Sequence, residues 1–187
     1  MNTYLRPALL MLLLFTLLCG AAYPLAVTGL GQLLFAHQAQ GSLIERQGRI
    51  IGSELLGQNF SAAKYFHGRP SAAGTEGYDA SASGASNLGP SSAKLRQSIE
   101  ARLATLKAEN PGQLVPAELL TASASGLDPD ISPQAAQFQI PRVASARGLD
   151  AQRLQQLIDQ HTQGRWLGFI GEPRVNVLQL NLALDAL

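Results

Sequence analysis

The sequence has a single cysteine, few aromatic residues and few charged residues. Because Cys19 is the only cysteine among 187 residues, neither an intrachain disulfide nor a zinc site built from several thiolates can form. Arg6 is the first of the 14 Lys and Arg residues. The 13 that follow it balance the 13 Asp and Glu residues in charge. Nucleic-acid binding requires a cluster of cations that releases counterions from the phosphates. The composition therefore argues against a nucleic-acid partner.

Motifs for phosphate binding and metal binding are also absent. No Gly-x-x-x-x-Gly-Lys-Ser/Thr phosphate loop occurs in the sequence. The three histidines, His37, His67 and His161, do not follow a metal-ligand spacing. Asp128-Pro129-Asp130 resembles part of a calcium loop but lacks the later carboxylates of such sites, so a turn ahead of Ser132 is the simpler interpretation. We therefore predict no metal and no cofactor of the chain's own.

Serine hydrolysis is the remaining chemistry for which the chain has candidate residues. Ser123 and Ser125 lie in Ala-Ser-Ala-Ser-Gly, which lacks the first glycine of the Gly-x-Ser-x-Gly nucleophile elbow. His67 and Asp128 would be needed to complete a triad, but serines are common in loops. We predict that the chain is not an enzyme by itself.

The most informative segment is a long uncharged run near the N-terminus. Residues 8–35 contain no Asp, Glu, Lys, Arg or His. A helix needs roughly 20 apolar residues, at ~1.5 Å each, to cross the hydrocarbon core of a membrane. We predict a transmembrane helix with its core at about 9–30, and Pro24 as a kink that lipid tolerates. The anchor positions are Leu9, Leu12, Phe15, Pro24 and Leu30.

This helix divides the chain into three parts. Residues 1–7 form a short cytoplasmic N-terminus, residues 8–35 form the helix and its exit, and residues 36–187 form a soluble domain. Arg6 precedes the span, whereas Arg46 and Arg49 follow it, so the positive-inside count is close to a tie. Charge therefore favours a cytoplasmic N-terminus only weakly.

Cleavage of the N-terminal segment is the competing interpretation. A signal peptide could end at the small residues Gly20-Ala21-Ala22, leaving Tyr23 as the mature N-terminus. A lipoprotein signal could use Cys19, but Leu18 is bulky where a small residue is expected. The uncharged run continues to Phe35, an extension that a signal peptide does not need.

The soluble domain combines strand and helix signals. Gln47-Gly48 between two apolar segments predicts a β-hairpin over residues 42–51. Arg174–Val177 is typical of a strand, and the apolar residues that follow fit either a continued strand or a last helix. In residues 71–92, 15 of 22 positions are Ser, Gly or Ala, which predicts a linker or a long surface loop lying on something else.

Helix-start signals are concentrated in the second half. Ser91 or Ser92 can cap a helix that reaches Glu109, Ser132-Pro133 opens a shorter helix, and Asp150 caps a third. A further helical segment follows Pro141. Together these signals predict a mixed α/β soluble domain behind one N-terminal transmembrane helix.

Several short motifs, spread in order along the chain, carry a family resemblance. They are Leu5–Ala8, Gly57–Phe60, Tyr65–Ala72, Ser83–Gly89, Thr121–Asp128, Gln139–Ala144, Val175–Val177 and Leu180–Asp185. Together they resemble the C subunit of the Kdp-type potassium-transporting ATPase from about Leu5 to Asp185. Ala36, Gln40 and Ala85 depart from the residues expected there, but these positions lie in loops.

The resemblance implies a role that composition does not show. Members of this family are held in the bacterial cytoplasmic (inner) membrane by one helix, with the soluble domain on the extracytoplasmic side. Their partners are a channel-like potassium-binding subunit, a P-type ATPase subunit and a very small hydrophobic subunit. ATP and potassium are handled by these partners, and the C subunit is described as a catalytic chaperone that raises the ATP affinity of the ATPase subunit. The alternative is a periplasmic enzyme or binding protein released by signal cleavage.

A surface for these partners is predicted around the Tyr-Phe-His-Gly-Arg-Pro motif and the Ser/Gly/Ala-rich segment after it. Interfaces favour aromatic residues and Arg because these provide contact area and forked hydrogen bonds. The alternative is that the two aromatic residues fill the domain's own core while the Arg pairs with a local carboxylate. The candidate partner contacts are Tyr65, Phe66, His67, Arg69, Asn87 and Leu88.

Overall fold

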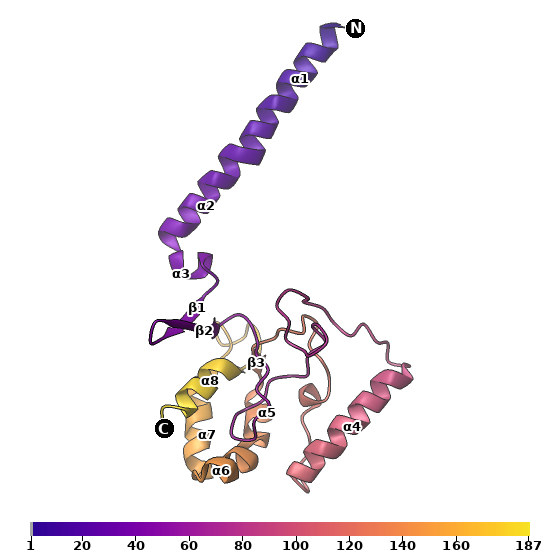
Figure 1. Cartoon of the computed structure of the whole chain (residues 1–187), viewed down its shortest axis with the longest axis vertical. Helices are drawn as coiled ribbons and strands as arrows, with labels where there is room; N and C mark the ends of the chain where they lie inside the picture. Colours follow the sequence, from indigo (N-terminus) through magenta and orange to yellow (C-terminus); the bar gives the residue numbers. More distant parts are fainter. Residues whose placement is uncertain (1) are drawn as a thin grey trace. The chain divides into compact units, whose positions relative to one another are not determined.

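The computed structural model describes residues 2–187 and divides the chain into two compact units, Met1–Leu43 and Ile44–Leu187. The first unit consists of helices and their connections: α1 (Asn2–Leu17), a π-helical turn η1 (Leu18–Ala22), α2 (Tyr23–Leu34) and the single turn α3 (Ala36–Ala39). The second unit contains helices and two small sheets (Figure 1).

The first unit contains a helix long and apolar enough to cross a membrane. It runs over Thr3–Leu34, 32 residues, and none of its most apolar window is buried. At ~1.5 Å per residue it is roughly 48 Å long, which exceeds the ~30 Å of a hydrocarbon core. Exposed leucine, methionine and phenylalanine side chains cover it all round, as expected of a helix whose solvent is lipid.

The helix accommodates Pro24 through the π-helical turn directly before it. Proline has no N–H to donate to the Gly20 carbonyl and its ring crowds that oxygen. Around this point the Tyr23 N–H donates to the Leu18 carbonyl, five residues back. The helix then continues four residues beyond the predicted core end at Leu30, because glycine weakens a helix without removing its hydrogen bonds. It ends where Phe35 leaves helical geometry.

The second unit begins with the predicted β-hairpin. β1 (Leu43–Arg46) pairs with β2 (Arg49–Ser53). The two turn residues, Gln47 and Gly48, have φ of 53° and 74°. Positive φ at both positions is the geometry of a type I′ turn, whose twist matches that of the strands. The hairpin prediction is confirmed.

Three helix starts follow the side-chain caps predicted from the sequence. Ser92 accepts a hydrogen bond from the Leu95 N–H at the start of α4 (Ala93–Glu109). Ser132 caps α5 (Pro133–Phe138) through the Ala135 N–H. Each cap satisfies one of the backbone donors that a helix start leaves unpaired.

The third cap, Asp150, accepts from the Gln152 N–H at the start of α7 (Ala151–His161). Between α5 and α7, α6 (Ile140–Arg147) has Pro141 in its first turn and ends at Gly148, which adopts a left-handed backbone. A short 3-10 turn, η2 (Ala117–Leu119), lies between α4 and α5.

A three-stranded antiparallel sheet closes the fold. Its order is β3 (Asp130–Ile131), β5 (Arg174–Asn176) and β4 (Thr162–Gln163). Ile131 and Thr162 both lie opposite Val175. The Asn176 side chain accepts from the Gln179 N–H, so the chain turns from β5 directly into α8 (Val177–Leu184). This cap decides between the two structures that the sequence allowed for the C-terminal segment.

The core of the second unit lies among the C-terminal helices. Figure 1 shows α5, α6, α7 and α8 gathered together, while α4 lies apart from them. The fully buried apolar side chains come from these helices, from β3 and β5, and from Phe66 and Ala73 of the long loop that connects β2 to α4. The largest are Phe66, Ile131, Leu154, Ile158, Leu180, Leu184, Val143 and Val175. α4 buries no residue completely, and only Leu106 of its apolar face packs against this core.

The Ser/Gly/Ala-rich segment folds partly onto this chain. Ser71 Oγ donates to the Gly126 carbonyl at 2.6 Å and accepts from the N–H of Tyr78 at 2.7 Å. The Gly84 N–H donates to the Ser125 carbonyl at 2.8 Å. Gly126 has φ of +69°, and a Cβ there would lie 2.8 Å from Ala73 Cβ. Residues 71–84 of the segment therefore pack against this chain's own turn at residues 123–126.

Candidate functional site

Two buried amide side chains hold the segment that the sequence marked as a partner surface. Asn181 of α8 accepts from the Phe66 N–H and donates to the Phe66 carbonyl, both at 2.9 Å. Gln139, between α5 and α6, accepts from the His67 N–H at 2.7 Å and donates to the His67 carbonyl at 3.0 Å. Each side-chain amide therefore bonds both the N–H and the carbonyl of one residue, as the backbone of a neighbouring β-strand does. We call this arrangement the amide clamp.

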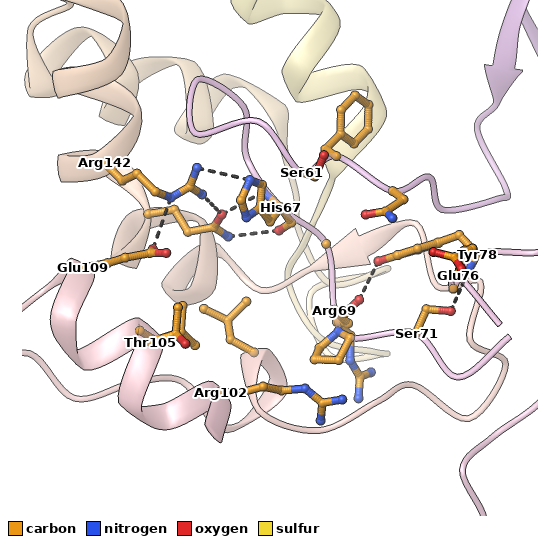
Figure 2. Close-up of a pocket in the computed structure, with 18 residues that line it drawn as sticks. Ser61, His67, Arg69, Ser71, Glu76, Tyr78, Arg102, Thr105, Glu109 and Arg142 are labelled. Atoms are coloured by element: carbon orange, nitrogen blue, oxygen red, sulfur yellow. Dashed lines mark hydrogen bonds and ion pairs between the residues drawn. The ribbon is translucent and has the colours of Figure 1, made fainter. Parts of the chain in front are cut away.

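A cleft of about 480 Å³ lies beside the clamped segment. Figure 2 shows its charged and polar side chains, which come from the long loop, α4 and α6. Each of the three guanidinium groups around the cleft has at least one acceptor within the chain. The lining residues used below are His67, Arg69, Tyr78, Arg102, Glu109 and Arg142.

Arg142 is the most heavily engaged of the three arginines. It donates to the carbonyls of Ala63 and Tyr65 at 2.7 and 2.9 Å and to Gln139 Oε1 at 2.7 Å. Its Nε lies 3.3 Å from Glu109 Oε2, close enough for an ion pair but not aligned for a hydrogen bond. Burial lowers the pKa of Arg142, an effect that Glu109 opposes, and the group stays charged. Arg142 therefore ties α4 to the long loop.

His67 lies against this arginine. Its Nε2 is 3.1 Å from the Ala62 carbonyl and 3.3 Å from Arg142 Nη1 (Figure 2). Burial, and after it the charge of Arg142, lower the pKa of His67 below its ordinary value. The imidazole is therefore neutral at pH 7.

Arg69 and Arg102 also have partners within the chain. Arg69 Nη1 pairs with Asp128 Oδ2 at 3.1 Å, and Arg102 Nη1 donates to the Leu120 carbonyl at 2.8 Å. Tyr78 donates its hydroxyl proton to the Arg69 carbonyl at 2.5 Å, and burial raises the pKa of Tyr78 to about 12. These contacts hold the long loop against the rest of the second unit. The contact of Arg102 joins α4 to the residue that follows η2.

The serines and carboxylates weighed as catalytic candidates serve turns. Ser123 Oγ accepts from the Gly126 N–H, and Ser125 Oγ accepts from the Leu127 N–H. Asp128 accepts from the Asp130 N–H while pairing with Arg69, which is the turn predicted ahead of Ser132. Within residues 2–187, no group of three or more His, Cys, Asp or Glu side chains is arranged to hold a metal.

The structure separates the six predicted partner-contact residues. Phe66 is fully buried in the core, so it is not available to a partner in this conformation. Arg69 pairs with Asp128, as the alternative interpretation proposed, whereas Tyr65 is only partly buried against the core and donates its hydroxyl proton to Asp185 at 3.0 Å. Partner contact stays a prediction for this segment. Asn87 is exposed, and His67 and Leu88 are partly exposed.

Sequence reasoning missed one exposed apolar group. The connection between β4 and β5 exposes Trp166, Leu167, Phe169 and Ile170 to solvent. The available signal was the chain's single tryptophan beside three other large apolar residues, set between Gly164 and Gly171. That run fitted neither helix nor strand periodicity.

The N-terminal helix indicates the class of protein. One exposed apolar helix precedes a mixed helix and sheet unit whose described arginines around the cleft pair with the chain itself. The exposed apolar helix fits a single-pass membrane protein.

Comparison with known proteins identifies the family. Residues 5–186 match the family model described as KdpC: K+-transporting ATPase, c chain. The chain is 59% identical over 187 residues to the potassium-transporting ATPase KdpC subunit of Methylibium petroleiphilum, covering 99% of this chain and 98% of the relative. The proteins of the same name from Bradyrhizobium diazoefficiens and Caulobacter vibrioides are 55% and 57% identical, covering 96% and 100% of this chain and 95% and 94% of the relatives.

The chain therefore belongs to the KdpC family. It is an accessory subunit of a potassium uptake complex, and the resemblance drawn from its motifs is confirmed. Membership of this complex implies partner subunits, and the apolar N-terminal helix fits a membrane protein.

Proposed function

We propose that the chain is a non-catalytic subunit, anchored in the bacterial cytoplasmic membrane by Thr3–Leu34, with its second unit on the extracytoplasmic side. The observation that supports an uncleaved anchor is the length of the apolar helix, which continues to Leu34, 12 residues beyond the point where a signal peptide would be cut. Its partners are a channel-like potassium-binding subunit, a P-type ATPase subunit and a small hydrophobic subunit, as the family resemblance implies. These partners handle ATP and potassium, and the chain carries no cofactor.

In this topology any increase in the ATP affinity of the ATPase subunit is indirect. ATP is cytoplasmic, whereas the second unit is outside, so the chain acts as a catalytic chaperone through its anchor or through partner subunits. The charged groups around the cleft support this view, since Arg69, Arg102 and Arg142 are held by acceptors of the chain. The expected signature is a higher KM for ATP in complexes assembled without the chain.

Site-directed thiol labelling tests the anchor and its orientation. In a Cys19→Ala background, a cysteine placed at exposed Gln113 should react with a membrane-impermeant maleimide in intact spheroplasts. A matched cysteine at Thr3 should react only after permeabilisation. The chain should also stay with membranes after an alkaline carbonate wash. A mature N-terminus at Tyr23, or labelling of the Thr3 position alone in intact spheroplasts, would overturn the proposal.

A further inference from the structure

The most exposed cluster of large apolar side chains in the second unit lies at the end of a hairpin-like loop. Trp166, Leu167, Phe169 and Ile170 are 68, 67, 73 and 45% exposed. We call these residues, with Gly168, the apolar tip. Soluble surfaces scatter single apolar residues, but several together mark a site that another surface covers. The tip belongs to the connection between β4 and β5 and is separate from the cleft described above.

The tip has a defined backbone. Trp166 and Ile170 exchange two hydrogen bonds, each N–H donating to the other's carbonyl at 2.9 Å. At its base, Arg165 Nη2 pairs with Glu172 Oε2 at 2.7 Å. A surface that is ordered before binding loses less conformational entropy on association.

The backbone of Leu167 gives a second, independent reason to assign the tip a role. Its φ is 51°, in the left-handed region that bulky residues rarely adopt and glycine adopts without cost. The adjacent Gly168 also has positive φ, at 82°. A leucine at such a position disfavours folding, and at 67% exposure it gains little from its own chain. Its side chain is therefore suited to contact another molecule.

We propose that the apolar tip inserts into an apolar pocket on the extracytoplasmic surface of a partner subunit of the potassium-transport complex. This inference rests on the proposed function and assigns it a surface. A tryptophan and a phenylalanine supported by aliphatic side chains have the chemistry of interface hot spots, where a few residues carry most of the binding free energy.

Charge at the base of the tip favours a protein pocket over the lipid surface. Segments that bind a bilayer interface usually combine apolar residues with an excess of Lys or Arg. Here Arg165 is paired with Glu172, and Arg174 lies 3.3 Å from Asp130, so each flanking cation has a carboxylate. The tip is apolar and its border is neutral, as in a pocket-filling protein contact with a polar rim.

Two substitutions test the tip within the intact complex. Leu167→Gly removes the side chain and relieves its backbone, and Phe169→Ser removes an aromatic ring that is 73% exposed. Leu114→Ala is the matched control, because Leu114 is 96% exposed outside the tip. Each full-length chain is tagged, expressed with its partner subunits and purified in mild detergent, and the Tm of each variant is measured.

The expected result is that each tip variant recovers roughly tenfold less of a partner subunit than the control does, with an unchanged Tm, or a higher one for Leu167→Gly. A photo-reactive benzoylphenylalanine at position 169 should crosslink to that subunit. Normal recovery with both tip variants overturns the inference. If the unaltered chain recovers no partner, the proposed function itself fails, which is a different result.

Trp166 separates the protein pocket from the bilayer. It is the only tryptophan in the chain, so tryptophan fluorescence of the full chain in vesicles without partners, excited at a wavelength that its tyrosines do not absorb, reports on the tip alone. We expect emission that aqueous acrylamide quenches and brominated lipid does not. Strong quenching by brominated lipid would assign the tip to the membrane and overturn docking to a subunit. Self-association that the tip variants abolish would assign it to a second copy of the chain, with the same consequence.

Discussion

Replacing Asn181 tests whether the chain's own core fixes the segment around Phe66. The Asn181 side chain is 2% exposed, and its amide is the partner of both the N–H and the carbonyl of Phe66. Asn181→Ala removes both hydrogen bonds at once. Two backbone groups then remain in the core without their partner, next to a phenylalanine that is fully buried.

The size of the effect follows from the cost of buried polar groups that lack hydrogen bonds. Each costs about 1–3 kcal/mol, so the variant should lose ~2–6 kcal/mol of unfolding free energy. A water molecule entering the space left by the amide would reduce the loss towards about 2 kcal/mol. For a unit of this size, 1 kcal/mol corresponds to roughly 3–4 °C in Tm. We therefore expect Tm to fall by at least ~6 °C.

Thermal unfolding of the full chain in detergent, followed by circular dichroism, measures this change. Gln179→Ala is the control, because Gln179 lies on the same helix and its side chain is partly exposed. Asn181→Leu keeps the number and branching of the heavy side-chain atoms but makes no hydrogen bonds, so it should be destabilised as well. If Asn181→Ala melts with the Gln179→Ala control, the amide clamp does not hold the segment.

Three further predictions concern the loop, the histidine and the anchor. Gly126→Ala should cost more stability in chemical denaturation than Gly112→Ala by at least about 1 kcal/mol: both positions have positive φ, but only a Cβ at 126 meets other atoms. Because burial lowers the folded-state pKa of His67, the unfolded chain takes up the proton first, and stability should fall as pH drops below about 6.5. The loss of Tm between about pH 7.5 and about pH 5.5 should be smaller in His67→Gln, and equal losses would refute the assignment. Leu14→Arg should weaken membrane insertion by ~2.5–3.5 kcal/mol in a glycosylation-based insertion assay, and unchanged insertion would argue against a spanning helix.

Elements with local causes could be predicted from the sequence. The Gln47-Gly48 turn and the caps at Ser92, Ser132 and Asp150 depend on residues within a few positions of each other, and the structure has them where they were expected. The uncharged run likewise identified the apolar helix, because helix length in lipid is a local property.

The course of the long loop could not be predicted, because its contacts are distant in sequence. Phe66 is held by Asn181, 115 positions away, and His67 by Gln139, 72 positions away. Aromatic residues beside an Arg are typical both of an interface and of a core plug, and only these long-range bonds place Phe66 in the core. The apolar tip was missed for another reason. A short run of large apolar residues fits a buried segment as well as an exposed one, and only the structure shows that Leu167 is exposed.

The most direct measurement is potassium-stimulated ATP hydrolysis by material purified from membranes through a tag on this chain. The predicted result is activity that co-purifies with a P-type ATPase subunit and a channel-like subunit, and none from the chain produced without them. ATP hydrolysis by the isolated chain, or isolation of the chain from its native membranes without any companion subunit, would contradict its role as a non-catalytic accessory subunit.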